Sequence, residues 1–266
     1  MILLLIPAAI IVWIFMLYCR SGHPGLSKLR GHVYAHRGLH GEGCPENSLA
    51  AFRKAVEQGY GMELDVHLLA DGSLAVIHDS LLLRTTGQDG VVEDLTADRL
   101  TEYFLEGTEQ TIPLFSQVLE LVDGKVPLIV ELKTYKGNHA ALTDAACRML
   151  KDYEGAYCIE SFDPFCVRHL RMHHPEVIRG QLAENFLESP SKYPVILKWI
   201  MTNQLVNFLT APDFVAYRFK DRNRLGMEVA RKLWRAQGVA WTITSQEDLN
   251  RATEEGYIPI FEGFSP

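Results

Sequence analysis

The feature that most constrains the fold is the alternation of short apolar runs with segments of helical periodicity. After residue 31 such runs, typical of buried strands, recur along the chain, and helix-period segments separate most of them. Strands joined through helices run parallel, since the helix returns the chain to the end where the strand began. The expected strands are His32–Ala35, Met62–Val66, Leu128–Leu132, Tyr157–Phe162, Ile178–Leu182, Phe214–Tyr217, Val239–Ile243 and Ile258–Phe261.

A further apolar run, Leu74–Ile77, follows Asp71-Gly72, and an Asp-Gly pair between extended runs predicts a tight hairpin. We interpret this run as a hairpin extension of the second strand that folds His78 back toward the carboxyl ends of the strands. Eight parallel strands then remain, which predicts an α/β fold, a (β/α)8 TIM barrel, and 266 residues suit a barrel of about 250. An open doubly wound sheet is the alternative, but the sequence has no glycine-rich dinucleotide fingerprint.

Polar side chains end three of these strands: His36, Arg37, Glu63, Asp65, Glu131 and Lys133. In a TIM barrel the carboxyl ends of the strands form the active-site face. Side chains two residues apart share a face of a strand, so we expect Glu63 beside Asp65 and Glu131 beside Lys133. Carboxylates a few Å apart repel one another and need a cation between them or raised pKa values. An all-oxygen set favours Mg²⁺ or Ca²⁺ over zinc.

These residues belong to a series of short motifs. The series is His36-Arg37-Gly38, Pro45-Glu46-Asn47-Ser48, Glu63-Leu64-Asp65, Asp71-Gly72, Val76-Ile77-His78-Asp79, Glu131-Leu132-Lys133 and Trp241-Thr242. In order and spacing it resembles the glycerophosphodiester phosphodiesterase family, from about residue 32 to residue 244. A single His-Arg-Gly or Glu-x-Asp is common by chance, so the specificity lies in the order of the whole series.

The resemblance implies a TIM-type barrel, a Mg²⁺ or Ca²⁺ site at Glu63, Asp65 and Glu131, and a catalytic pair, His36 and His78. Phosphodiester hydrolysis needs one group that deprotonates the nucleophile and another that protonates the leaving alkoxide. An imidazole with a pKa near ~6.5 suits either task at neutral pH. We expect His36 as the base and His78 as the acid. The nucleophile is either the 2-hydroxyl of the glycerol, which gives a cyclic phosphate, or water.

Four further residues have two interpretations each. The resemblance implies phosphate contacts from Arg37 and Lys133, which could instead neutralise the carboxylates as ion pairs. Glu46 is expected either to hydrogen-bond the substrate or to support its loop, and Trp241 either to line the pocket or to pack in the core. Asn47 is predicted to cap the next helix. The other histidines are expected to be solvated or structural: His23, His32, His40, His67, His139, His169, His173 and His174.

The amino-terminal segment, residues 1–18, carries no charged side chain. At about 1.5 Å per residue it reaches roughly 27 Å, close to the ~30 Å hydrocarbon core, which predicts a transmembrane anchor. A cleaved signal peptide is the alternative, but a basic n-region and a small-residue cleavage site are lacking. Tyr18 argues against a lipid-bearing Cys19, because a small residue is expected before such a cysteine.

Residues 19–31, rich in Gly, Ser, Pro and basic side chains, predict a linker to a barrel domain at 32–266. Positive charges follow the apolar segment, so the positive-inside rule places the domain of this single-pass membrane protein in the cytoplasm. These charges are Arg20, Lys28 and Arg30.

Composition and motifs together predict an enzyme. The net charge of −7 and the lack of a basic run exclude a nucleic-acid partner, and the five cysteines form no C-x-x-C pair. The expected reaction is metal-dependent hydrolysis of a glycerophosphodiester to sn-glycerol 3-phosphate and an alcohol. One alternative is a lysophospholipase D-like membrane-lipid phosphodiesterase, favoured by the anchor and the apolar segment Ser189–Asn207. The other is a non-catalytic glycerophosphodiester- or metal-binding barrel, although every motif residue is present.

The carboxyl-terminal run departs from the pattern of the family. Members usually close with a Gly-Ile-Ile-Thr-Asp-like strand before a proline, whereas this chain has Pro259-Ile260-Phe261-Glu262-Gly263-Phe264. The contribution of the last strand to the active-site face is therefore open, and the sequence does not predict an oligomeric state.

Overall fold

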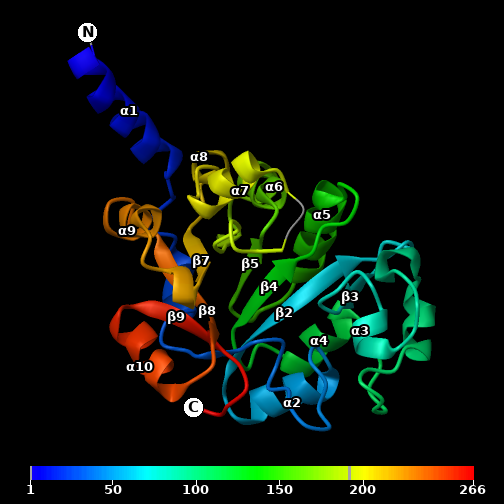
Figure 1. Ribbon diagram of the computed structural model, residues 1–266. Helices are drawn as coiled ribbons and strands as arrows, with labels where there is room; N and C mark the ends of the chain where they lie inside the picture. Colours follow the sequence, from blue (N-terminus) through cyan, green and yellow to red (C-terminus); the bar gives the residue numbers. More distant parts are fainter. Residues whose placement is uncertain (1, 191–192) are drawn as a thin grey trace.

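The computed structural model describes residues 2–190 and 193–266, and in it a ring of parallel strands is surrounded by helices (Figure 1). One nine-stranded sheet contains β1 (Tyr34–Ala35), which pairs with both β2 (Gly61–Leu68) and β9 (Tyr257–Phe261) and so closes the ring. Only β3 (Leu74–Val76) lies outside the ring, antiparallel to β2. The ring therefore has eight parallel strands, and the predicted TIM barrel is confirmed.

The remaining elements alternate around the ring. Its other strands are β4 (Leu128–Leu132), β5 (Tyr157–Ser161), β6 (Arg179–Ala183), β7 (Phe214–Arg218) and β8 (Gln237–Ile243). Among the described residues the α-helices are α1 (Ile2–Met16), α2 (Leu49–Glu57), α3 (Leu83–Thr86), α4 (Phe115–Val122), α5 (His139–Leu150), α6 (Pro164–His173), α7 (Val195–Thr202), α8 (Asn207–Thr210), α9 (Leu225–Lys232) and α10 (Gln246–Glu254). Short 3₁₀ turns are η1 (Pro24–Lys28), η2 (Val92–Asp94), η3 (Ala97–Glu102) and η4 (Phe219–Asp221). Each expected strand is present within a few residues of its predicted bounds.

The predicted hairpin after β2 is also confirmed. Gly72 turns the chain with a φ of 86°, a left-handed conformation that favours glycine. On the returning strand, the Ile77 amide donates to the Asp65 carbonyl at 3.1 Å. The hairpin thereby brings His78 to the carboxyl end of β2.

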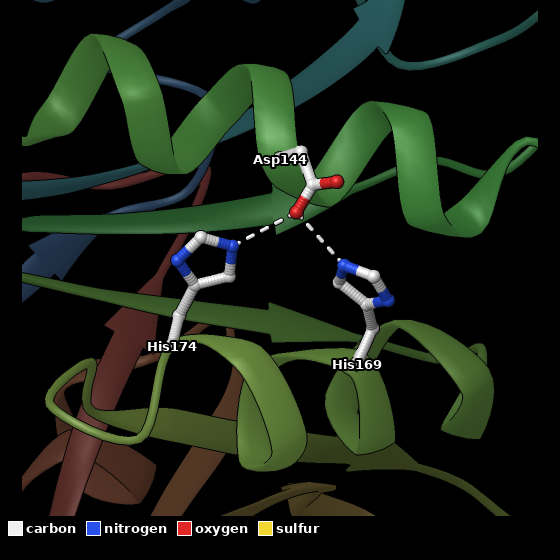
Figure 2. A group of neighbouring side chains, drawn as sticks. All are labelled: Asp144, His169 and His174. Carbon is white, nitrogen blue, oxygen red and sulfur yellow. Dashed lines mark hydrogen bonds and ion pairs between the residues drawn. The ribbon is translucent and has the colours of Figure 1, made fainter.

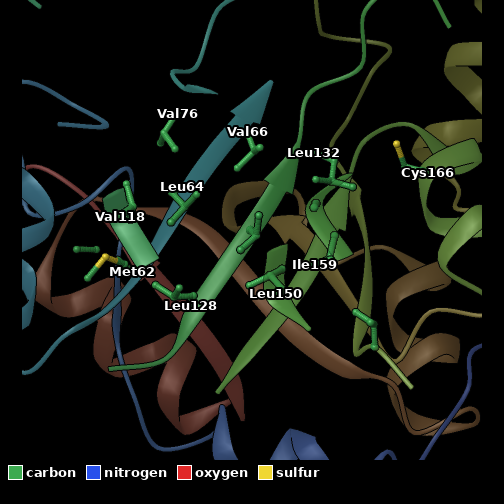
Figure 3. Packing of buried hydrophobic residues seen from close by; sticks show 14 of the residues in the cluster. Met62, Leu64, Val66, Val76, Val118, Leu128, Leu132, Leu150, Ile159 and Cys166 are labelled. Atoms are coloured by element: carbon green, nitrogen blue, oxygen red, sulfur yellow. The ribbon is translucent and has the colours of Figure 1, made fainter. Parts of the chain in front are cut away.

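Alternation along the strands divides the barrel into an outer and an inner layer of side chains. Leu64 and Val130 point outward and pack with the helices in the cluster that Figure 3 shows. Ile129 and Phe214 belong to a second buried cluster. Glu131 lies two residues beyond Ile129 and therefore points to the same side of β4. The inner face of the barrel is thus apolar toward the amino ends of the strands and carries charged groups at their carboxyl ends.

The predicted transmembrane anchor is wrong. Its first residue, Met1, lies outside the described residues, and α1 has 15 residues, which at about 1.5 Å per residue span roughly 22 Å. Within residues 2–190 and 193–266, no helix has both the length and the apolar character needed to cross a membrane. The helix ends at Met16 because the residues after it pack on the barrel: Leu17 and Cys19 are buried, and Arg20 pairs with Asp213 at 2.5 Å.

The segment expected as a linker packs against the barrel. Leu26 and Leu29 are buried and belong to the same apolar cluster as Tyr34 of β1. The Tyr34 hydroxyl donates to the Leu29 carbonyl at 2.8 Å. This segment therefore contributes to the core.

The predicted cap of α2 is wrong by one residue. The Ser48 hydroxyl, not the Asn47 side chain, accepts the Ala51 amide at 3.1 Å. Asn47 has a φ of 53°, and its side chain donates to Asp65 Oδ2 at 2.8 Å. Because Ser48 caps the helix, the side-chain amide of Asn47 is free to donate to the carboxylate of Asp65.

Candidate active site

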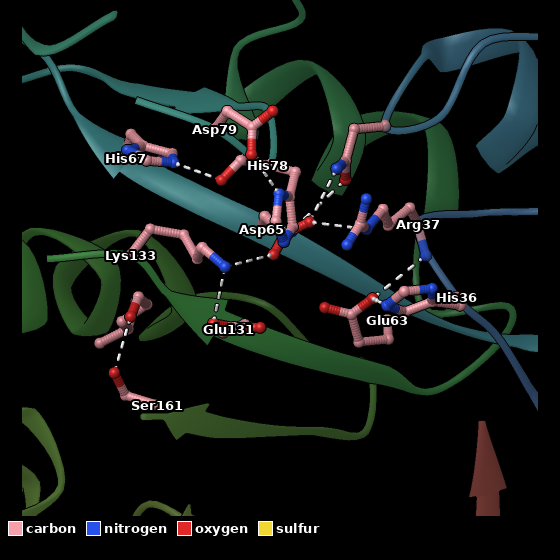
Figure 4. Close-up of polar contacts among 12 residues, drawn as sticks. His36, Arg37, Glu63, Asp65, His67, His78, Asp79, Glu131, Lys133 and Ser161 are labelled. Atoms are coloured by element: carbon pink, nitrogen blue, oxygen red, sulfur yellow. Dashed lines mark hydrogen bonds and ion pairs between the residues drawn. The ribbon is translucent and has the colours of Figure 1, made fainter. Parts of the chain in front are cut away.

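Three buried carboxylates meet at the carboxyl ends of β2 and β4. Glu63, Asp65 and Glu131 each place one oxygen within 4.8 Å of an oxygen of the other two (Figure 4). The strands adjoin in register, with Asp65 opposite Glu131. Burial and repulsion from Asp65 and Glu131 raise the pKa of Glu63 well above its usual range. Burial likewise raises the pKa of Glu131. A bound divalent cation would relieve this repulsion, and the oxygen set fits Mg²⁺ or Ca²⁺.

Two cations, Arg37 and Lys133, flank the carboxylates. Lys133 Nζ lies 3.0 Å from Glu131 Oε1 and 3.4 Å from Asp65 Oδ1. Arg37 Nε lies 3.6 Å from Asp65 Oδ2, and the Arg37 amide donates to Glu63 at 3.1 Å. Burial alone would raise the pKa of Asp65, but Lys133 and other nearby cations hold it below its usual range. Both cations are therefore in ion pairs with the carboxylates that could hold a metal ion.

A glycine fixes the turn that carries Arg37. Arg37 and Gly38 both have left-handed backbones, with φ values of 54° and 79°. A β-carbon at Gly38 would lie 2.9 Å from Cβ of Ala51 in α2. This close approach explains the glycine of the His-Arg-Gly motif.

His36 follows β1 and lies between two carboxylates. Its Nε2 is 3.8 Å from Glu63 Oε2, and its Nδ1 is 3.2 Å from Glu262 Oε2. His40 Nε2 meets the other oxygen of Glu262 at 3.1 Å. The imidazoles of His36 and His40 hold the pKa of Glu262 below its usual range. Glu262 is therefore anionic at neutral pH and faces one nitrogen of His36, which leaves Nε2 on the side of the metal site.

His78 is held from two sides. Its Nδ1 is hydrogen-bonded to Asp79 Oδ1 at 2.6 Å, and its carbonyl accepts a hydrogen bond from Nε2 of the buried His67 at 3.2 Å. His67 Nδ1 in turn meets Glu93 Oε1 at 2.7 Å. Burial lowers the pKa of His78, in spite of the opposing Asp65 charge and the Asp79 bond.

Glu46 and Arg84 join the turn after β1 to the loop of His78. Arg37 Nη1 donates to both oxygens of Glu46 at 3.1 Å, and Arg84 Nη2 donates to Glu46 Oε1 at 2.6 Å. Arg84 also pairs with Asp79. Glu46 thus lies in a chain of ion pairs that connects the predicted phosphate contact Arg37 to Asp79 beside His78.

Trp241 lies in β8, which one strand, β9, separates from β1 in the ring. Its Nε1 donates to the Ala216 carbonyl at 3.1 Å, and its ring meets Phe162 edge to face with centroids 5.6 Å apart. The ring is partly exposed. It is therefore fixed in orientation while part of its surface faces solvent.

Several charged residues of the site were not singled out from the sequence. Glu160 of β5 lies opposite Glu131, and burial and the charges of Glu131 and Asp65 raise its pKa well above its usual range. The alternation rule signals it, because Glu160 lies two residues after the inward-facing Cys158. Glu262 answers the open question of the last strand, since it lies at the mouth. Asp79 belongs to the Val76-Ile77-His78-Asp79 motif, but the motif gave it no role of its own.

Two cavities adjoin at the mouth. One of about 270 Å³ is bounded by His78, Glu131 and Lys133. The second, of about 300 Å³, is mostly apolar and is lined by the side chains Phe165, Phe186, Tyr193, Leu197 and Met201. Thr134, Phe162 and Asp163 border both. Three lining positions lie in the predicted apolar segment, of which residues 191 and 192 are outside the described range.

The chain is similar to known proteins of one family. The model of the glycerophosphoryl diester phosphodiesterase family matches residues 36–262. The chain is 27% identical over 237 residues to a glycerophosphodiester phosphodiesterase of Caldanaerobacter subterraneus, with 84% of this chain and 90% of the relative covered. It is 42% identical over 172 residues to one of Bacillus altitudinis, with 60% and 70% covered. An Oleispira antarctica phosphodiesterase, solved in complex with the product sn-glycerol-3-phosphate, shares the fold with a TM-score of 0.75 at 23% identity, with 91% and 95% covered.

Proposed function

The chain belongs to the glycerophosphoryl diester phosphodiesterase family, and we propose that it hydrolyses phosphodiesters as this family does. A divalent cation would bind at Glu63, Asp65 and Glu131. His36 and His78 would transfer the protons. The protein is thus a phosphoric diester hydrolase that converts glycerophosphodiesters to sn-glycerol 3-phosphate and an alcohol. The observation that most strongly supports this proposal is that three buried carboxylates lie together at one end of the barrel. The proposed catalytic domain is 32–266, which contains the matched range.

The carboxylates hold the cation, Mg²⁺ or Ca²⁺. When bound, the cation supplies positive charge that neutralises the non-bridging oxygens of the phosphodiester. Arg37 and Lys133 add positive charge beside it and orient the phosphate once their ion pairs with the carboxylates loosen. Together these groups reduce the repulsion between the phosphate and an approaching nucleophile.

His36 acts as the base. With the proton of the neutral imidazole on Nδ1, facing Glu262, the lone pair of Nε2 points toward the metal site and accepts the proton of the attacking hydroxyl. The anionic Glu262 stabilises the imidazolium that forms. The nucleophile is the 2-hydroxyl of the substrate glycerol or water, and the base has the same task in both routes.

His78 acts as the acid. Asp79 accepts the Nδ1 hydrogen at 2.6 Å, so Nε2 of the imidazolium is left to protonate the leaving alkoxide. The lowered pKa of His78 makes this imidazolium a stronger acid than an exposed one. The partly exposed Trp241 ring offers an apolar wall for the glycerol or the alcohol.

A second substrate class is favoured by the apolar cavity. Tyr193, Leu197 and Met201 lie four residues apart and line one side of it, and the cavity borders the catalytic one through Phe162. Each methylene buried there would contribute up to ~0.8 kcal/mol of binding. Diesters with a single acyl chain, such as lysophosphatidylcholine, are therefore the second candidate.

One pair of assays separates the two candidates. Release of glycerol 3-phosphate from glycerophosphocholine is measured beside release of choline from lysophosphatidylcholine, each with and without a chelator. We expect chelator-sensitive turnover of glycerophosphocholine. Turnover of neither substrate, with the fold intact, would instead support a non-catalytic barrel, whereas a preference for the acylated diester would support the second candidate.

A further inference from the structure

A second group of metal-binding side chains lies between α5 and α6. Asp144 comes from α5, His169 from α6, and His174 from the residue that ends α6 (Figure 2). One oxygen of Asp144, Oδ1, meets His169 Nε2 at 2.8 Å and His174 Nε2 at 2.9 Å. All three side chains are partly exposed, so an ion from solvent has access. The proposed catalytic mechanism uses none of these residues.

The three donor atoms already face a common point. They lie within 4.8 Å of one another, and the two imidazoles present the same nitrogen to a single carboxylate oxygen. A tetrahedral zinc ion with bonds of about 2.0 to 2.2 Å to nitrogen and oxygen spaces its ligand atoms by a little over 3 Å. Small side-chain rotations that separate Asp144 Oδ1 slightly from the two imidazole nitrogens would therefore convert the hydrogen-bonded triad into three ligands of one ion.

The ligand set points to a borderline transition metal. Two imidazoles and one carboxylate suit Zn²⁺, whereas Mg²⁺ and Ca²⁺ prefer oxygen alone. Cys147, one turn along α5, is buried and is not among the side chains whose donor atoms meet at this point. The protein would then supply two nitrogen ligands and one oxygen ligand, and a water molecule would be the fourth ligand of a tetrahedral zinc ion.

A fourth residue supports this role for His174. Glu176 Oε1 lies 4.0 Å from His174 Nδ1, the nitrogen that does not face Asp144. A carboxylate near the second nitrogen of a ligating histidine favours the tautomer that offers its other nitrogen to the metal. His173 offers no donor atom to this point, and its ring packs against that of His169 at a tilt of 31° with centroids 4.4 Å apart.

From these contacts we infer that Asp144, His169 and His174 form a zinc-binding site, distinct from the catalytic metal site, that ties α6 to α5 on the outside of the barrel. Bound zinc replaces the two hydrogen bonds to Asp144 with three bonds to one ion. Because the ligands come from two helices, zinc binding stabilises their packing and raises the thermal stability of the folded chain.

The test counts bound zinc in the full chain. Metal-free protein is titrated with Zn²⁺ by calorimetry in the presence of saturating Mg²⁺, and thermal unfolding is followed with and without Zn²⁺. We expect one equivalent at the cluster and an increase in Tm. The His169→Ala and His174→Ala changes should each weaken this binding by at least about 100-fold, because even partners outside the first coordination shell contribute about 10- to 100-fold.

The matched control is His173→Ala, which removes an imidazole that packs against His169 but removes no ligand, and it should weaken zinc binding far less than either ligand change. A Glu63→Gln/Glu131→Gln variant removes any zinc held at the catalytic site and should keep the equivalent at the cluster. Asp144→Asn retains a hydrogen-bond acceptor, so it tests the carboxylate without removing the triad and should lose the zinc-dependent rise in Tm. Equal zinc binding by the wild type and a folded His169→Ala/His174→Ala variant would overturn the inference.

Discussion

His36 and Glu262 follow neighbouring strands, β1 and β9, and Nδ1 of the imidazole lies 3.2 Å from Oε2 of the carboxylate. This contact ties the proposed base to the last strand of the barrel. It also favours the tautomer of His36 with the proton on Nδ1, because Glu262 is anionic, and Nε2 is then an acceptor on the side of Glu63.

The first prediction concerns Glu262. Glu262→Gln should lower kcat about 10- to 100-fold and leave KM nearly unchanged, because the imidazolium of His36 loses its counter-charge while the substrate contacts remain. Steady-state kinetics with glycerophosphocholine measure this split. His40→Ala, which removes only the other partner of Glu262, is the control and should have a smaller effect. Wild-type kcat in the Gln variant would show that Glu262 does not position His36.

The second prediction distinguishes the acid from the base. With glycerophosphocholine, His36→Ala and His78→Ala should each lose about 10² to 10⁴ in kcat. With the p-nitrophenyl ester of glycerol phosphate, whose leaving group needs no proton, the loss in His78→Ala should shrink to about tenfold or less. His36→Ala should keep its full loss, because the nucleophile still needs a base. The reverse pattern would exchange the two roles.

The third prediction concerns the apolar cavity. We compare the KM for lysophosphatidylcholine with the KM for glycerophosphocholine and express their ratio as a free energy. Leu197→Ser should reduce the preference for lysophosphatidylcholine by about 1 kcal/mol or more, because the acyl chain loses an apolar contact. Turnover of glycerophosphocholine should not change. Val195→Ser is the matched control, since Val195 is on the same helix but 74% exposed and outside the cavity. Equal effects of the two substitutions would remove the cavity from substrate binding.

The fourth prediction concerns Glu160. Burial and nearby carboxylates raise its pKa in the folded chain, so above the unfolded value of about 4.3 the folded state binds more protons than the unfolded state. The stability of the chelated protein should therefore decrease as pH rises from about 4.5 to 8, and Glu63 adds a change of the same sign. Glu160→Gln should weaken this dependence and stabilise the protein at pH 8 by roughly 1 to 3 kcal/mol.

Urea unfolding at several pH values measures this effect. Glu247→Gln is the control, because Glu247 lies on the surface of α10 with its side chain 82% exposed. It should reproduce the wild-type dependence. If Glu160→Gln has the same dependence as the wild type, the charge of Glu160 does not oppose folding.

The strand pattern and the carboxylate cluster could be predicted because both depend on local sequence rules. A buried parallel strand is a short apolar run, and its period of two places Glu63 and Asp65 on one face. The Asp71-Gly72 pair predicted the hairpin that brings His78 back to the site, because a tight turn with a left-handed glycine is signalled by local sequence alone. The motif order then predicted that the candidate site residues lie at one end of the barrel.

The remaining features depend on contacts between distant residues. The end of α1 is set by burial of Leu17 and Cys19 on the barrel, which an apolar run alone does not reveal. Asn47 matched a helix cap, but its side chain meets Asp65, eighteen positions away, and Ser48 caps instead. The partnership of His36 with Glu262 joins opposite ends of the chain, so no local pattern predicts it.

The most direct test of the account is metal-dependent turnover by the carboxylate variants. Release of glycerol 3-phosphate from glycerophosphocholine is measured on chelated protein as Mg²⁺ or Ca²⁺ is added back. The account predicts no activity in the chelated wild type, full recovery with the ion, and no recovery in Glu63→Gln, Asp65→Asn or Glu131→Gln with the fold intact. Full activity of the chelated protein, or wild-type recovery in these variants, would contradict it.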